Sequence, residues 1–156
     1  MYLSDFVFSK NPRLQGTLSK SFKAIYQNDL PEIIEFHGRW GSLAVSKNLY
    51  KGFQPYENDK HIVVVIGGPL LMFENNTFLK NEKTGNEGTK AVYKRWLQNQ
   101  LSWDDDLSGP FVVLIIDKET GEFSCITDVM SFIPVFILID NDNIMLSTHV
   151  DALANA

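Results

Sequence analysis

The sequence predicts an α+β fold with mostly antiparallel sheets, and three observations support that class. The run from His61 to Ile66 is apolar and β-branched, which favours a strand covered on both faces. The last third holds two apolar-turn-apolar patterns typical of hairpins, across 111–127 and 134–148. Two other segments repeat apolar residues at spacings of three and four, which favours helices. Separate helical and hairpin segments indicate sheets covered by helices.

The first helix is expected over 14–28, where Leu14, Leu18, Phe22 and Ile25 share one face. The second is expected over 89–101 with Thr89 as its N-cap, and a last short helix over 151–154. Gly67-Gly68-Pro69 ends the strand that starts at His61. Strands are expected at 6–8, 33–36, 41–46, 61–66, 111–117, 122–127, 134–140 and 143–148.

Composition bounds the class of protein. The 156 residues suit one domain, and 14 basic against 19 acidic residues give a net charge of −5, so we expect no nucleic-acid partner. A single cysteine excludes an intrachain disulfide and a cysteine-rich zinc site. The longest apolar runs, 62–66 and 111–116, are far shorter than the roughly 20 residues that span a bilayer. We therefore expect no membrane partner, and a cytoplasmic location.

Isolated chemical groups in the sequence have ordinary structural explanations. Cys125 lies mid-strand and is expected to be a small buried residue. The histidines are scattered, so no metal site is expected, and the acidic run 104–106 is expected to be a solvated turn. Gly67-Gly68 lacks the lysine and hydroxyl residue of a phosphate-binding loop, so it is expected to be a tight turn that another backbone segment passes closely.

A series of short motifs in fixed order resembles the glutaminase domain of asparagine synthetases. Upstream, Gln54-Pro55 and the strand ending at Gly67-Gly68 stay in register with that family. The downstream motifs are LSGPF at 107–111, DKETG at 117–121, TD at 127–128, PVF at 134–136 and STHVDAL at 147–153. The resemblance implies an N-terminal-nucleophile hydrolase fold over 1–156. That fold is a four-layer αββα sandwich, here a single domain that can lead a longer asparagine-synthetase-like protein.

The family's chemistry needs a cysteine at the chain's amino terminus, because the thiolate attacks glutamine and the adjacent α-amine carries the proton. The resemblance aligns Ser4 with that nucleophile, but three residues precede Ser4, so its nitrogen is an amide. Gly67 aligns with the family's oxyanion-stabilising asparagine, and Gly68 keeps the backbone N–H. The resemblance also implies Glu87 as the residue holding the substrate amine. Ser42 replaces the substrate-binding arginine, for which Arg39 could substitute if the strand shifted.

The sequence thus predicts a degenerate glutaminase-like domain that is a scaffold, not a catalyst by itself. Its partner would be an asparagine-synthetase-like ligase domain in cis or in trans, which forms amides with ATP and Mg²⁺; this domain needs no cofactor. Two alternatives stay open: an amidohydrolase active after trimming to expose Ser4, and a module binding an amino acid or peptide near Gly67, Gly68 and Glu87. Self-association also stays open.

Overall fold

A computed structural model describes residues 4–26, 29–80 and 85–156. It confirms the α+β class with mostly antiparallel sheets, and its described residues form four α-helices. The chain divides into two compact units. We call residues 48–116 and 123–133 the inserted unit, because they interrupt the terminal unit, which consists of residues 4–47, 117–122 and 134–156.

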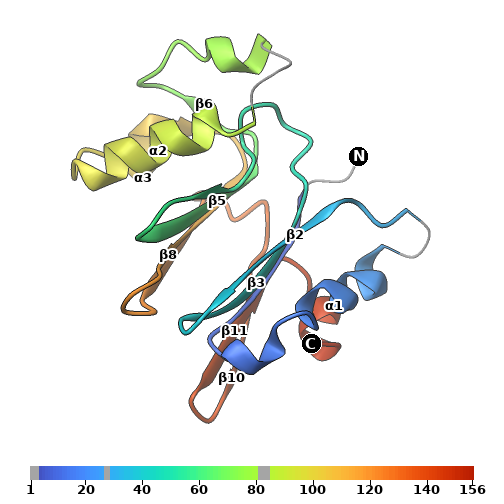
Figure 1. Ribbon diagram of the computed structural model, residues 1–156. Helices are drawn as coiled ribbons and strands as arrows, with labels where there is room; N and C mark the ends of the chain where they lie inside the picture. Colours follow the sequence, from blue (N-terminus) through green and yellow to red (C-terminus); the bar gives the residue numbers. More distant parts are fainter. Residues whose placement is uncertain (1–3, 27–28, 81–84) are drawn as a thin grey trace. The chain divides into compact units, whose positions relative to one another are not determined.

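The terminal unit is built on a five-stranded sheet in the order β10-β11-β1-β3-β2 (Figure 1). The central strand β1 pairs antiparallel with both neighbours, so that Val7 lies opposite Ser147 on one side and Ala44 on the other. Strand contacts therefore join the two ends of the sequence. The strands are β1 (Phe6–Ser9), β2 (Ile33–Gly38), β3 (Gly41–Ser46), β10 (Phe136–Asp140) and β11 (Asn143–Ser147).

Helices α1 (Leu18–Ile25) and α4 (Val150–Ala154) lie on the same side of this sheet (Figure 1). Val7, Ala44 and Met145 come from three neighbouring strands and pack with Phe22 and other apolar residues of the two helices. The predicted first helix began too early, at residue 14. The chain instead forms a 3-10 turn at Pro12–Leu14, and a left-handed Gly16 with φ of 72° delays the α-helix. Its predicted end at 27–28 lies outside the described residues.

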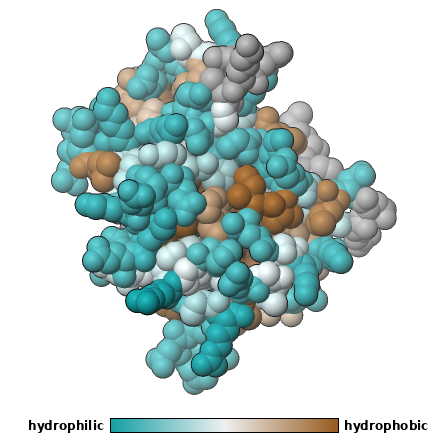
Figure 2. Space-filling view, viewed as in Figure 1, coloured by the Kyte–Doolittle hydropathy of each residue, from teal (hydrophilic) through white to brown (hydrophobic). Residues whose placement is uncertain are grey.

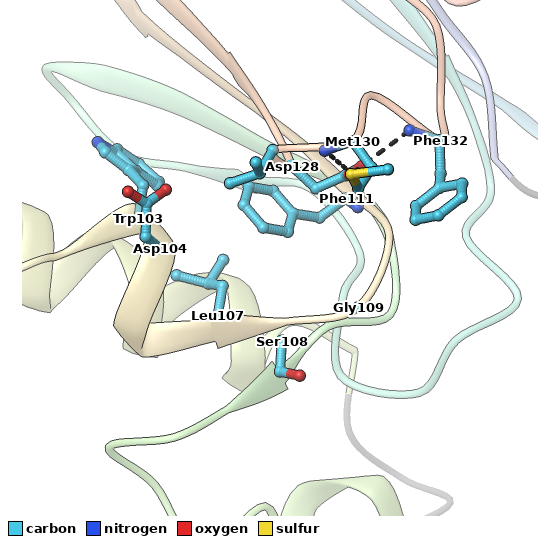
Figure 3. A pocket seen from close by; sticks show the side chains of 10 residues that line it. Trp103, Asp104, Leu107, Ser108, Gly109, Phe111, Asp128, Met130 and Phe132 are labelled. Carbon is cyan, nitrogen blue, oxygen red and sulfur yellow. Dashed lines mark hydrogen bonds between the residues drawn. The ribbon is translucent and has the colours of Figure 1, made fainter.

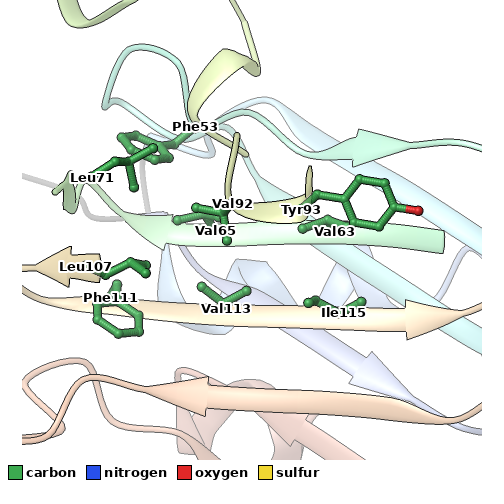
Figure 4. Close-up of a cluster of buried hydrophobic side chains, with 10 residues drawn as sticks. All are labelled: Phe53, Val63, Val65, Leu71, Val92, Tyr93, Leu107, Phe111, Val113 and Ile115. Carbon is green, nitrogen blue, oxygen red and sulfur yellow. The ribbon is translucent and has the colours of Figure 1, made fainter. Parts of the chain in front are cut away.

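The inserted unit is built on a four-stranded sheet in the order β4-β5-β8-β9, with a two-stranded pair of β6 and β7. Alternate residues of β5 and β8, including Val63, Val65, Val113 and Ile115, pack against Val92 of helix α2 (Figure 4). Its strands are β4 (Tyr56–Glu57), β5 (His61–Gly67), β6 (Leu70–Leu71), β7 (Leu107–Ser108), β8 (Phe111–Asp117) and β9 (Phe123–Thr127). Its helices are α2 (Glu87–Leu97), α3 (Trp103–Asp106) and the 3-10 turn Thr77–Lys80.

Two details of the predicted second helix were wrong. Helix α2 starts at Glu87, so Thr89 lies inside it and is not its N-cap; the Thr89 hydroxyl is instead buried and donates to the Gln54 carbonyl at 2.9 Å. The helix ends at Leu97 rather than at residue 101, and Asn99, with φ of 53°, has left the helical conformation. The acidic run 104–106, expected as a solvated turn, forms most of helix α3.

The face seen in Figure 2 is largely polar, with apolar side chains gathered in separate patches. All five residues of β10, an edge strand, are exposed, and so are Val129, Met130 and Phe132 of the inserted unit. None of the helices in the described part of the chain is long and apolar enough to cross a bilayer.

Candidate functional site

Ser4 directly precedes β1 in the terminal unit. It is 1% exposed, and its hydroxyl has no hydrogen-bond partner. The next residue, Asp5, is held firmly, because its carboxylate accepts hydrogen bonds from the hydroxyls of Tyr26 and Thr148. The Thr148 hydroxyl also accepts from the Phe6 amide at 3.2 Å. The start of β1 is therefore a fixed backbone segment that carries a buried, unpaired serine hydroxyl.

Arg39 lies in the turn between β2 and β3, exposed to solvent. The antiparallel register sets Phe6 of β1 opposite Val45 of β3, and Ser9 opposite Ser42. Ser4 is thus at the Ser46 end of β3, and Arg39 is beyond the Gly41 end. At about 3.3 Å per residue, the five steps from Gly41 to Ser46 place these two ends roughly 17 Å apart. The structure does not bring Arg39 and Ser4 together, and β3 shows no shift that would.

Gly67 ends β5 in a conformation that suits only glycine. Its φ is 87°, and a Cβ built there would lie 2.5 Å from the carbonyl oxygen of Pro110. The carbonyl of Pro110 therefore leaves no room for a side chain at residue 67. This matches the expected close passage of another backbone segment at Gly67, but Gly67 is part of strand β5 and not of a tight turn.

Gly68, the expected oxyanion donor, is covered by an aromatic ring. A Cβ at Gly68 would lie 2.3 Å from Cδ1 of Tyr50. Beside this contact is a cavity of about 240 Å³, which Gly68 and Tyr50 line together with Pro110, Phe132 and Ile133. None of the described residues that line it carries a charge. The space next to Gly68 is therefore apolar apart from the tyrosine hydroxyl and backbone groups.

Glu87 is the first residue of α2, and its Oε2 atom is buried without a hydrogen-bond partner. It is not among the described residues that line the cavity beside Gly68. Glu87 and Gly68 thus belong to the same unit, but of the two only Gly68 is among the described lining of this cavity. The shared amino-acid pocket near Gly67, Gly68 and Glu87 finds no support in that cavity.

Asn48 is a residue that sequence reasoning missed. It is 4% exposed, and its Nδ2 donates to the carbonyls of Val65 at 2.9 Å and Gly67 at 2.8 Å. Its Oδ1 accepts from the Tyr50 amide at 2.9 Å. One side chain thereby fixes the end of β5 and the segment that carries Tyr50 over Gly68. Only these long-range contacts identify Asn48, because no local motif contains it.

Asp128 organises the segment that follows β9. Its Oδ1 accepts from the amides of Met130 at 3.0 Å and Phe132 at 3.4 Å, and its Oδ2 accepts from the Phe111 amide at 3.4 Å (Figure 3). These bonds curl residues 128–132 beside the start of β8. A second cavity, of about 230 Å³, opens between this segment and α3.

Two other titratable groups have structural roles. Burial raises the pKa of the Cys125 thiol to about 11, so the thiol stays protonated at neutral pH and is a poor nucleophile. Asp106 accepts two hydrogen bonds from Arg95, at 2.6 and 3.0 Å, and these bonds lower the pKa of its carboxyl. Within residues 4–26, 29–80 and 85–156, no group of three His, Cys, Asp or Glu side chains is arranged to hold a metal ion.

Comparison of the sequence with protein-family models and with curated proteins finds no match.

Proposed function

We propose that this chain is a catalytically silent glutaminase-like domain that supports an asparagine-synthetase-like, ATP-dependent amide-forming enzyme. ATP and Mg²⁺ would act in the partner ligase domain. The ordered motifs between residues 54 and 153 support the proposal. The backbone conformation of Gly67 and the cavity beside Gly68 support it further.

The conformation of Gly67 is the observation that carries the proposal. The motif alignment sets Gly67 where an active glutaminase needs an asparagine side chain to stabilise the oxyanion. Here φ is 87° and the Pro110 carbonyl blocks the Cβ position at 2.5 Å. The loss of that asparagine is therefore built into the backbone and into its neighbour, so a single substitution would not restore the side chain.

The cavity beside Gly68 supports the same conclusion. Free glutamine carries an ammonium and a carboxylate, and burying either group without a charged or hydrogen-bonding partner is costly. None of the described residues lining this cavity is charged, and the ring of Tyr50 covers Gly68. This cavity by itself would favour an apolar group over an amino acid.

Incubation of the purified chain with glutamine tests whether the chain lacks glutaminase activity. We expect no release of glutamate above background, measured by a glutamate-dehydrogenase assay over hours at pH 7–8. The Ser4→Ala variant is the matched control, because any glutamate that both proteins release comes from a contaminant. Steady turnover by the native chain that Ser4→Ala abolishes would overturn the proposal.

The scaffold part has a separate test, the intact mass of the protein isolated from its own cells. A mass well above 17.7 kDa, with synthetase sequence in the same chain, is expected for support in cis. A mass near 17.7 kDa requires a separate ligase to co-purify with the chain. A chain of that mass with no ligase bound would contradict the scaffold role.

A second candidate function rests on the unpaired hydroxyl of Ser4. A buried hydroxyl without a partner is costly, and such groups are often retained for chemistry. Proteolytic removal of residues 1–3 would give Ser4 a free α-amine as its base. A chain produced with Ser4 at its amino terminus should then hydrolyse glutamine or another amide, whereas continued inactivity of that chain would remove this candidate.

A further inference from the structure

The cavity between α3 and the segment after β9 has a wall of large rings. Trp103 of α3, Phe111 of β8 and Phe132 line it, together with Met130 (Figure 3). Met130 and Phe132 are 70% and 67% exposed and Trp103 is half-buried, so these three side chains are reachable from solvent, whereas Phe111 is a core residue and only 2% exposed. All the residues that line the cavity belong to the inserted unit. Aromatic and thioether groups on one concave surface are suited to an apolar or softly polarised ligand.

The same cavity is negatively charged. Two carboxylates line it, those of Asp104 and Asp128, and none of its described lining residues is basic. Asp128 is 8% exposed, and backbone amides satisfy its oxygens without neutralising its charge. Asp104 also lines the cavity, and it is exposed to solvent. An occupant that complements this lining must therefore bring a positive charge.

A metal ion does not fit this chemistry. Hard cations such as Ca²⁺ and Mg²⁺ need six or more oxygen ligands, and most of this lining is aromatic or aliphatic. An organic ammonium fits better, because its charge is spread over a body with apolar groups. Aromatic faces attract such a cation through their quadrupoles, and the flanking carboxylates add attraction at longer range.

We propose that this cavity binds a small organic cation, a methylated or otherwise apolar ammonium, between the rings of Trp103 and Phe132 and the carboxylates of Asp104 and Asp128, with the buried ring of Phe111 beneath it. The volume of about 230 Å³ is adequate for one trimethylammonium group and a short chain, and is small for a larger ligand. The site is separate from the cavity beside Gly68 except for Phe132, which lines both. It does not depend on glutaminase ancestry.

Titration of the full chain with defined probes tests the proposal. Choline and tetramethylammonium are the cationic probes, and 3,3-dimethyl-1-butanol is the neutral probe of choline's shape. The readout is the indole N–H signal of Trp103 in a ¹⁵N-labelled chain, assigned by its loss in Trp103→Phe. We expect saturable shifts with choline, with a dissociation constant on the order of 1 mM, since so small a ligand makes few contacts. The neutral probe should bind at least about fivefold more weakly.

Two neighbouring aspartates supply matched variants. Asp104 lines the cavity, whereas Asp105, also exposed and on the same short helix, does not. Asp104→Asn should weaken choline binding about fivefold or more, and Asp105→Asn by less than about twofold. Thermal melting of both variants checks that each is folded.

Three results would overturn the proposal. The first is equal affinity for choline and its neutral analogue, which would mean that the cavity selects only apolar shape. The second is an equal loss of affinity in Asp104→Asn and Asp105→Asn, which would mean that choline senses only the net charge of the surface. The third is the absence of saturation with either cationic probe at concentrations up to about 50 mM, fifty times the expected dissociation constant.

Discussion

The Nδ2 atom of Asn48 lies 2.8 Å from the carbonyl oxygen of Gly67, and this hydrogen bond anchors the end of β5. The same nitrogen lies 2.9 Å from the Val65 carbonyl. A buried side-chain amide thus fixes the backbone at Gly67, the residue that our proposal aligns with an oxyanion-stabilising asparagine. The end of β5 is thus held by a side chain nearly twenty residues earlier in the sequence.

Replacing Asn48 by alanine should destabilise the fold by about 2–4 kcal/mol, because two buried carbonyls lose their donor and the Tyr50 amide loses its acceptor. Urea unfolding followed by tryptophan fluorescence measures the change. Asn155→Ala is the control, since Asn155 makes one exposed hydrogen bond, and its effect should stay within about 0.5 kcal/mol. Equal effects of the two variants would show that the Asn48 contacts add little.

Gly67→Ala should destabilise the fold by about 2–4 kcal/mol, because it combines a positive φ with a Cβ that collides with the Pro110 carbonyl. Gly16→Ala separates the two causes. Gly16 also has a positive φ, of 72°, but no atom lies within 4 Å of its Cβ position, so only about 1 kcal/mol is expected. Thermal unfolding of both variants tests this order, and a smaller loss at Gly67 would contradict the close approach.

Ser4→Ala should leave stability unchanged or raise it by about 1 kcal/mol, because it removes a buried hydroxyl that has no partner. Ser21→Ala is the paired control. The buried Ser21 hydroxyl donates to the Leu18 carbonyl at 2.6 Å, and its loss should cost about 1 kcal/mol. Equilibrium unfolding in urea compares the two. A clear destabilisation by Ser4→Ala would mean that this hydroxyl has a stabilising partner in solution.

The Arg95–Asp106 pair should make stability depend on acid pH. Hydrogen bonds from Arg95 lower the pKa of the Asp106 carboxyl below its ordinary 3.8. The contribution is therefore fully present above about pH 4, and is lost as the pH falls through the lowered folded-state pKa. Asp106→Asn should melt at a lower temperature than the native chain at pH 7, and the difference should shrink below pH 3.8.

Asp105→Asn is the control for that pH series, since Asp105 is exposed and accepts a hydrogen bond from the nearby Ser102 hydroxyl. Its melting temperature should follow that of the native chain from pH 7 to pH 2. A gap between the native chain and Asp106→Asn that stays constant over this range would contradict the lowered pKa.

Strands with a strong local pattern could be predicted from the sequence. The strand expected at 41–46 matches β3, and the one expected at 61–66 matches β5 apart from its last residue, Gly67. The run 62–66 is apolar and rich in β-branched residues, and a glycine pair follows it. Helix α3 could not be predicted, because three consecutive aspartates have poor helix propensity. Hydrogen bonds stabilise it: the Asp106 carboxylate accepts from Arg95 and from the Ser102 amide, which both lie outside the run.

The candidate site was predictable only in part. The expectation that other backbone passes closely holds for Gly67, which the Pro110 carbonyl approaches. The expected tight turn at Gly67-Gly68 was not found, because Gly67 is the last residue of strand β5. Sequence reasoning did not find that Tyr50 covers Gly68, or that Glu87 lies outside the cavity beside it. Both facts depend on how the loop of residues 48–54 folds back onto β5. Hydrophobic periodicity predicts helices and strands, but it does not predict the path of a loop.

The pairing of β1 with β11 has a consequence for how the protein is made. Val7 pairs with Ser147, so the central strand of the five-stranded sheet cannot pair with β11 until 140 more residues have been synthesised. Nearly all of the inserted unit emerges from the ribosome in between. Long sequence separation slows folding, and early segments fold as they appear. The nascent chain is thus expected to order its middle first, while β1 stays without β11 and exposed to chaperones until synthesis is almost complete.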